Sequence, residues 1–293
     1  MTAPVVIAAD GFRAEIGRRG AELLSHVDPS GREWMWDGDP TFWNRRAPVL
    51  FPIVGRAAGD QIRHRGRTFP MPQHGFAPEA EFELVEATGH SCRLRLEANA
   101  ATRAIYPFEF RFDVAFEFAD GALRQSATVT NIGENALAAS LGFHPAFVWP
   151  PGPDRRAYEL RFDKPELAPI RRIVDGRLAL PVGGQPAPDG VLRLADDLFE
   201  AGAMVFDLPA SRSVWFGRPG DPGIAVDFEG LPHLGIWTLP GAGFLCIEPW
   251  QGHHAPVGFD GNFFDMPGVL HLGSGETATR EIAMRCGASG LGR

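Results

Sequence analysis

The stretch Phe108-Glu-Phe-Arg-Phe-Asp-Val-Ala-Phe-Glu-Phe118 alternates apolar residues with mostly polar ones. Successive side chains of a strand point to opposite faces, so this pattern predicts a β-strand with one face in a hydrophobic core. Asp120-Gly121 is a typical turn dipeptide, and residues 123–130 resume the alternation. Together these segments predict an antiparallel hairpin with one buried and one wetter face.

Short segments of the same kind recur along the chain, separated by turn residues. The 293 residues include 35 Gly and 26 Pro, which suits many strands joined by loops. No segment keeps a helical apolar period over three turns, and neither a repeat nor a linker is visible. We therefore expect an all-β fold, a large and mainly antiparallel sandwich with long loops, formed as a single domain over residues 1–293. Further expected strands are residues 5–8, 12–16, 82–86, 92–96, 158–162, 198–206, 214–216, 224–228, 234–237, 244–248 and 279–286.

Composition excludes several classes of protein. The net charge is −8 and no basic run occurs, so we expect no nucleic-acid or membrane partner. No apolar run approaches the roughly 20 residues that span a bilayer. The N-terminus lacks the basic region of a signal peptide. Cys92, Cys246 and Cys286 lie in apolar segments without zinc or redox spacing, which is typical of a cytoplasmic protein.

The first candidate site residue is a glutamate in Phe244-Leu-Cys-Ile-Glu248-Pro-Trp-Gln-Gly252. Alternation places Glu248 on the same strand face as Phe244 and Cys246. Pro249 has no N–H to donate, so the strand is predicted to end at Glu248. A carboxylate at this position either reaches water past the strand end or belongs to a site.

Two histidines stand at similar transitions. His74 lies in Pro72-Gln-His-Gly-Phe-Ala-Pro78, where the prolines restrict the loop, and His144 lies in Leu141-Gly-Phe-His-Pro-Ala-Phe147. A single histidine of this kind is commonly structural, but we expect these two to share a pocket with Glu248. Residues 42–56 are apolar and irregular, which indicates either a pocket wall or a buried connecting loop.

Four motifs in order carry a resemblance to a known family. They are Arg46-Ala-Pro-Val-Leu-Phe-Pro-Ile-Val-Gly-Arg56, His74-Gly-Phe-Ala77, Gly142-Phe-His-Pro-Ala-Phe147 and Cys246-Ile-Glu-Pro-Trp-Gln-Gly252. In this order they resemble the aldose 1-epimerase (galactose mutarotase) family, most closely its LacX-like branch. The resemblance runs from about residue 42 to residue 252. It implies a galactose mutarotase-like β-supersandwich that interconverts the α and β anomers of a hexose without cofactor or metal.

The resemblance also implies roles for the site residues. Glu248 is the general base that takes the C1 hydroxyl proton, and His144 is the general acid that protonates the ring oxygen. His74 and Arg56 bind and polarise the sugar. The chemistry suits these residue types, because ring opening removes one proton and adds another at atoms of one hemiacetal.

Further substrate contacts are less specific. Asp196 or its neighbour Asp197 resembles a hydroxyl-binding aspartate of the family. Trp237 is expected to stack on the sugar, with core packing as the alternative. The same two alternatives apply to Trp250, Phe143 and Phe147.

Other functions compete with this interpretation. His253 and His254, with Glu248 and the two site histidines, are candidate metal ligands. Glu248 paired with Asp227 or Asp196 would suit a glycosidase, and a non-catalytic sugar-binding protein is a third alternative.

Phosphorylated hexoses are an alternative substrate class. A set of arginines is expected near the pocket wall, where guanidinium groups would bind phosphate or would form only a solvated surface. The set consists of Arg45, Arg46, Arg56, Arg63 and Arg65.

Overall fold

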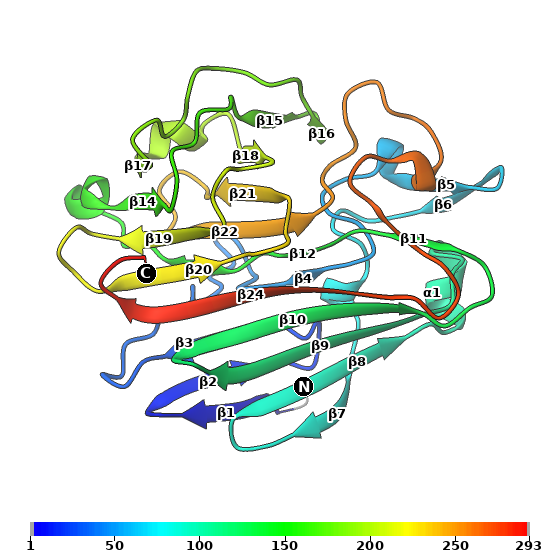
Figure 1. The fold of residues 1–293 in the computed structure, drawn as a ribbon, viewed down its shortest axis with the longest axis horizontal. Coiled ribbons are helices and arrows are strands. Elements are labelled where there is room, and N and C mark those ends of the chain that lie inside the picture. The colour runs from blue at the N-terminus through cyan, green and yellow to red at the C-terminus, as the bar shows by residue number, and fades with distance from the viewer. Residues whose placement is uncertain (1–2, 292–293) are drawn as a thin grey trace.

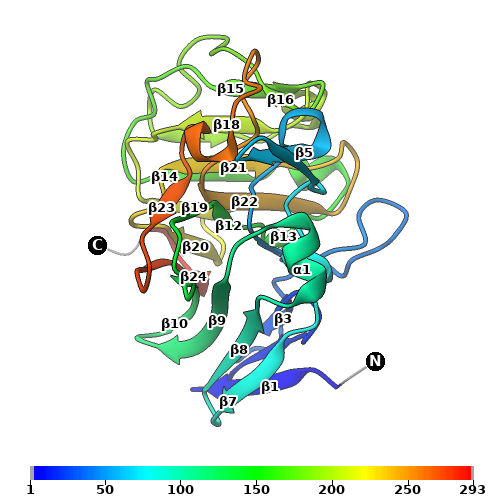
Figure 2. The ribbon, with the colours of Figure 1, turned by 90° about the vertical axis from the view of Figure 1, so that its right-hand side faces the viewer.

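The computed structural model describes residues 3–291 and is nearly all β. Two large sheets and three small ones make up the fold, and their strands pair antiparallel, as predicted (Figures 1 and 2). The two large sheets share one hydrophobic core. Phe162 of one sheet lies 5.1 Å from Phe206 of the other, measured between ring centroids, and Phe112 stacks on Phe51 at 4.3 Å.

The larger sheet contains the predicted hairpin. Its nine strands run in the order β17 (Val191–Arg193), β14 (Glu159–Phe162), β19 (Ser213–Gly217), β20 (Gly223–Asp227), β24 (Thr277–Ala288), β10 (Ala122–Asn131), β9 (Phe110–Ala119), β8 (Ser91–Glu97) and β7 (Glu83–Ala87). Strands β9 and β10 pair from Ala119 opposite Ala122 to Phe110 opposite Asn131. The apolar residues of β9 face the core, where each buried Phe contributes roughly 1.5–3 kcal/mol.

The second large sheet carries the candidate site residues His144 and Glu248. Its eight strands are β16 (Arg177–Leu178), β15 (Arg171–Val174), β18 (Met204–Asp207), β21 (His233–Trp237), β22 (Phe244–Gln251), β12 (Leu141–Phe143) and β4 (Val49–Leu50) in this order, with β13 (Ala146–Val148) also paired to β22. Strand β4 is at the edge of this sheet, which agrees with the prolines that follow and precede it.

Smaller elements complete the fold. The small sheets are β1 (Val5–Ala9), β2 (Phe12–Ile16) and β3 (Leu23–Val27); β5 (Gln61–His64) and β6 (Arg67–Pro70); and β11 (Leu137–Ala139) and β23 (Leu270–Leu272). The helical turns are Ala58–Asp60, Ala77–Glu79, Pro153–Ala157, Asp196–Phe199 and Phe263–Asp265.

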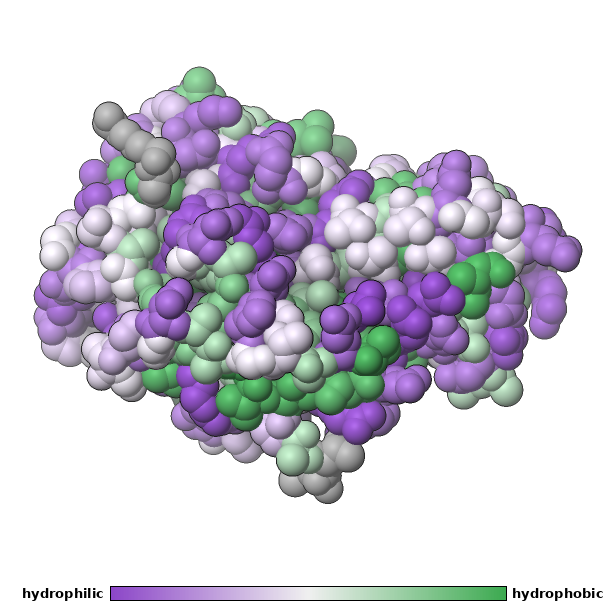
Figure 3. Space-filling model, turned by 60° about the horizontal axis from the view of Figure 1, so that its bottom comes forward, coloured by the Kyte–Doolittle hydropathy of each residue, from purple (hydrophilic) through white to green (hydrophobic). Residues whose placement is uncertain are grey.

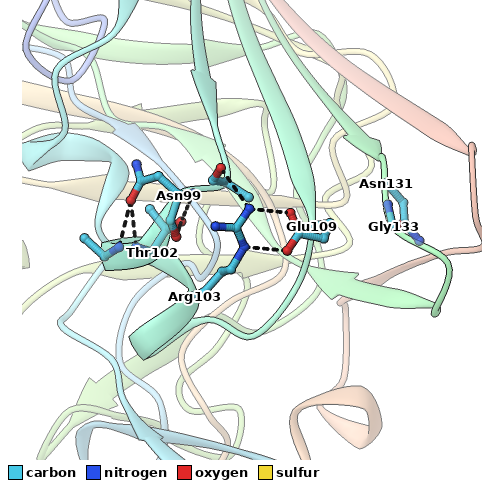
Figure 4. A network of polar contacts seen from close by, with 8 residues as sticks. Asn99, Thr102, Arg103, Glu109, Asn131 and Gly133 are labelled. Atoms are coloured by element: carbon cyan, nitrogen blue, oxygen red, sulfur yellow. Dashed lines mark hydrogen bonds and ion pairs between the residues drawn. The ribbon is translucent and has the colours of Figure 1, made fainter.

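One short helix, α1 (Ala100–Ile105), was not anticipated, because six residues are too few to show an apolar period. It forms where Asn99 and Thr102 make a capping box, in which each side chain accepts a hydrogen bond from the other residue's backbone N–H. Arg103 then pairs with Glu109 at 2.9 Å (Figure 4). This turn delays the start of β9 to Phe110, two residues later than predicted.

The prediction of one strand over residues 198–206 was wrong. Asp196–Phe199 is a helical turn, and β18 begins only at Met204. Gly202 between them has φ +78°, a left-handed conformation that ends the turn and that a strand does not contain.

One face of the molecule is largely polar. On the face shown in Figure 3, hydrophilic residues (purple) surround a narrower apolar strip (green). Of the large exposed apolar side chains, Val6 lies in β1, Val85 in β7 and Leu180 in a loop. Within residues 3–291, no helix combines the length and the apolar character needed to cross a membrane.

Candidate active site

Strand β22 continues through Pro249 to Gln251, so the prediction that the proline ends it was wrong. Backbone N–H groups of a strand alternate between its two neighbours, and Ile247 donates to Pro145 on the β12–β13 side. Pro249 therefore faces the same side, at the gap between β12 and β13, where no ladder bond is lost. Glu248 remains inside the sheet, opposite Gly235 of β21.

The gap between β12 and β13 holds His144 against Glu248. Both strands pair with β22, and the two residues between them, His144 and Pro145, leave the ladder. The His144 Nε2 atom lies 3.1 Å from the Glu248 Oε2 atom. The two residues are only 6% and 2% exposed, so the contact is shielded from water. The structure thus brings together two of the predicted catalytic groups from positions far apart in sequence.

Burial shifts both groups toward their neutral forms. It raises the pKa of the Glu248 carboxyl well above 4.5, and the Trp250 indole N–H opposes this rise. It lowers the pKa of His144 from 6.5 to about 3, with a smaller contribution from the charge of His254. In the ion-paired form, Glu248 is therefore a stronger base and His144 a stronger acid than in water.

Trp250 follows Glu248 on the same face of β22 and is fitted between two glycines. A Cβ on Gly142 of β12 would lie 2.7 Å from the indole, and one on Gly235 of β21 would lie 2.5 Å from it. The absence of side chains at these positions lets the indole lie flat across both neighbouring strands. The packing fixes the indole beside the Glu248 carboxyl.

His74 is held in an unusual backbone conformation. It has φ +65°, and Gly75 after it has φ +76°. The His74 Nδ1 atom accepts a hydrogen bond of 3.1 Å from the Gly55 N–H, so the neutral ring carries its proton on Nε2. The His74 and His144 rings meet edge to face at 5.5 Å. Burial, together with the charges of His144 and His254, holds the pKa of His74 well below 6.5.

Replacing Gly75 with Ala tests how firmly this loop is fixed. The left-handed conformation alone costs on the order of 1–3 kcal/mol for a non-glycine residue. A Cβ at Gly75 would also lie 2.1 Å from the Phe51 carbonyl oxygen. Gly66 has φ +74° but no atom within 4 Å of its Cβ position, so Gly66→Ala carries the backbone cost only. We expect Gly75→Ala to lose clearly more free energy of unfolding in urea than Gly66→Ala; equal losses would show that the loop yields.

The three groups line one cavity of about 670 Å³, within the range of small-molecule sites. Trp43 stacks on the His144 ring at 4.8 Å, and Trp237 meets the same ring edge-on at 5.7 Å. The cavity is lined by Trp43, Asn44, Arg45, Pro48, Leu50, Pro72, Gln73, His74, Gly75, Pro78, Glu79, His144, Ile173, Gly202, Ala203, Trp237, Glu248, Trp250 and His254. Residues 42–56 were predicted to form either a pocket wall or a buried connecting loop. Five of them line the cavity, so this segment forms part of a pocket wall.

Two predicted substrate contacts lie outside this lining. Arg56 is half exposed and pairs with Asp60 at 3.1 Å. Asp196 pairs with the buried Arg155 at 3.0 Å and accepts a hydrogen bond from the Gly241 N–H. Both side chains thus form ion pairs, and neither is among the residues that line the cavity. Asp197, the alternative to Asp196, does not line the cavity either.

Several lining residues were not predicted as substrate contacts. Trp43 lies in residues 42–56, but nothing in the neighbouring sequence distinguishes it from an aromatic residue of the core. His254 was considered only as a metal ligand; its ring occupies the space beside Gly55, where a Cβ would lie 2.0 Å from it. Of the other aromatics, Phe143 and Phe147 pack in the main core.

Three possible metal ligands lie close together beside the cavity. One ligand atom each of His144, Cys246 and Glu248 lies within 4.8 Å of the others. Burial raises the pKa of the Cys246 thiol well above 9.0, which disfavours the thiolate that binds metal. The predicted alternative that included His253 is not supported, because its ring packs against His233 at 4.9 Å and does not line the cavity.

The sequence and its relatives identify the family. The model of the aldose 1-epimerase family matches residues 5–179. The chain belongs to the aldose 1-epimerase family. Two relatives are the plasmid and chromosomal forms of protein LacX from Lactococcus lactis subsp. lactis, each 31% identical over 250 residues, which are 80% of this chain and 82% of the relative. The LacX-like resemblance is confirmed.

Two solved structures of similar proteins share the fold. A galactose mutarotase related enzyme from Lactobacillus acidophilus is 30% identical with a TM-score of 0.90, covering 98% of both chains. A galactose mutarotase-like protein from Lactobacillus casei ATCC 334 is 30% identical with a TM-score of 0.88, covering 97% of this chain and 100% of that one. The predicted galactose mutarotase-like fold is confirmed. Family and fold together support an isomerase-type enzyme that acts on a sugar.

Proposed function

We propose that this protein is an aldose 1-epimerase that interconverts the α and β anomers of an aldohexose. The observation that carries the proposal is the buried 3.1 Å contact between Glu248 and His144, which both line a cavity with several aromatic side chains. Ring opening of a hemiacetal needs a base and an acid a few ångströms apart, because O1 loses a proton while the neighbouring ring oxygen gains one.

The ring-opening step uses each group once. Glu248, as the carboxylate, takes the proton from the O1 hydroxyl. The C1–O5 bond breaks, its electron pair stays on O5, and the His144 imidazolium donates its proton to O5. The open aldehyde is left with a neutral carboxyl and a neutral imidazole, which are the forms that burial favours. Starting from the ion-paired form, burial of the two groups therefore favours both proton transfers of ring opening.

Ring closure on the other face completes the exchange. The aldehyde rotates about the C1–C2 bond and presents its opposite face to the C5 hydroxyl. His144 takes the proton back from that hydroxyl as the O5–C1 bond forms, and Glu248 returns a proton to O1. His74, with its proton on Nε2, donates a hydrogen bond to a sugar oxygen, while Trp43 and Trp237 contact the C–H faces of the ring.

Polarimetry on fresh α-glucose and α-galactose tests the proposal. We expect the optical rotation to reach equilibrium faster in proportion to enzyme concentration, beyond the spontaneous rate. A protein that binds the sugar in a calorimeter but leaves this rate unchanged would be a carbohydrate-binding protein, and the proposed activity would be wrong.

The dependence of kcat/KM on pH follows from the shifted pKa values. The competent pair holds one proton between the two groups. Below about pH 3, His144 is protonated while Glu248 keeps its proton, so no base remains. Above the raised pKa of Glu248, the pair loses its proton and no acid remains. We expect the acidic limb of the profile near pH 3 and not near the ordinary histidine value of 6.5, measured by exchange NMR between the anomers; an acidic limb with its midpoint near pH 6.5 would contradict the assignment.

A further inference from the structure

The cavity contains one guanidinium group among the described residues that line it, that of Arg45. The other arginines of the expected phosphate-binding set are engaged elsewhere. Arg46 donates to the Leu24 carbonyl, Arg63 to the Asp260 carbonyl, and Arg65 to the Asn135 side chain. Among the described residues that line the cavity, Arg45 is therefore the one arginine that could contact a phosphate there.

Arg45 is itself surrounded by acceptors. It forms an ion pair with Glu79, which also lines the cavity, and its NH1 lies 3.7 Å from a carboxylate oxygen of Glu22. The same NH1 donates to the Pro78 carbonyl at 2.9 Å. Its side chain is only 20% exposed. A phosphate would therefore compete with these acceptors for the guanidinium.

The Glu22 carboxylate cannot move away from Arg45. It is buried, and its Oε1 atom accepts hydrogen bonds from the backbone N–H groups of Arg46 at 2.6 Å and Ala47 at 3.0 Å. Glu79, in contrast, is 54% exposed and also pairs with Arg19. The positive charges of Arg19 and Arg45 and the negative charges of Glu22 and Glu79 therefore sum to zero around the Arg45 side of the cavity.

We infer that Glu79 is a specificity-determining residue, which pairs with Arg45 to make this side of the cavity bind sugar hydroxyls and reject sugar phosphates. This inference rests on the proposed anomer exchange and narrows its substrate class to uncharged sugars. A hydroxyl both donates and accepts, so it fits between a carboxylate and a guanidinium. A phosphate only accepts and carries about two negative charges, so the two nearby carboxylates repel it.

Removing the Glu79 charge tests the inference. Glu79→Gln leaves two arginines against one glutamate, an excess of one positive charge beside the cavity. We expect the wild type to have at least a ten-fold lower kcat/KM for glucose 6-phosphate than for glucose, and the variant to narrow this ratio several-fold, both measured by exchange NMR. The gain should shrink at high ionic strength, because salt screens the partly exposed charges.

Two further measurements sharpen the test. Glu229→Gln removes the same charge at an exposed position outside the cavity and should leave the substrate ratio unchanged. Inorganic phosphate should inhibit Glu79→Gln at concentrations several-fold lower than those that inhibit the wild type. Equal kcat/KM values of the wild type for both sugars, or a ratio unaltered by Glu79→Gln, would overturn the inference but leave the proposed function intact. A wild type inactive on both sugars would overturn both.

Discussion

Glu248→Gln is expected to lower kcat for anomer interconversion by about 10²–10⁴-fold. The amide keeps the size of the side chain and can still hydrogen-bond to His144, but it cannot take the O1 proton. Sugar binding should change little, because the cavity walls and their aromatic side chains stay in place. The loss should therefore fall on kcat and not on KM. Exchange NMR between the anomers at saturating glucose measures it directly.

A buried glutamate outside the cavity supplies the control. Glu166 is 2% exposed and accepts hydrogen bonds from the backbone N–H groups of Ala210 and Ser211. Glu166→Gln should weaken folding without a comparable loss of kcat, as followed by urea unfolding. If Glu248→Gln kept near-normal kcat, or lost activity only in proportion to unfolded protein, Glu248 would not be the base.

His144→Asn is expected to lower kcat by about 10²-fold or more, because no group then donates a proton to the departing ring oxygen. The effect should be non-additive with that of Glu248→Gln, since the two side chains act as one proton-transfer pair. We expect the double variant to be hardly slower than the slower single variant. Rates for all four proteins on one sugar complete the cycle.

His26 is a suitable reference for His144→Asn. It is 1% exposed, and its Nδ1 lies 3.2 Å from the Cys286 sulfur, outside the cavity lining. Burial lowers its pKa to about 4, as burial does for His144. His26→Asn should therefore remove a buried imidazole, as His144→Asn does, but leave kcat largely unchanged. Multiplicative effects of the two catalytic substitutions would contradict a coupled pair.

Local sequence patterns predicted much of the fold. The alternation in β9 and β10 predicted a half-buried antiparallel hairpin, because a strand's period of two is a property of the backbone itself. The capping box of α1 and the continuation of β22 through Pro249 were missed. In both cases the outcome depends on hydrogen-bond partners that a local pattern does not specify.

The residues of the candidate site were also predicted in part from the sequence. Motif order pointed to Glu248, His144 and His74, since residue type and strand-to-loop position are visible in the sequence. The same reasoning placed Arg56 and Asp196 at the sugar, whereas the two side chains pair with Asp60 and Arg155 and do not line the cavity. The residues that a charged side chain meets are brought near it by the fold, and local sequence does not specify them.

The sequence by itself therefore determined the all-β class, the alternation of buried and exposed faces, and the family. Only the tertiary structure decided that His144 touches Glu248, that Trp43 covers the imidazole, and that Glu79 neutralises Arg45. The physical reason is the distance along the chain over which each effect acts. Backbone periodicity acts over neighbouring residues, whereas the pKa values and charge balance of the cavity come from side chains that sheet register and loop closure bring together from distant parts of the chain.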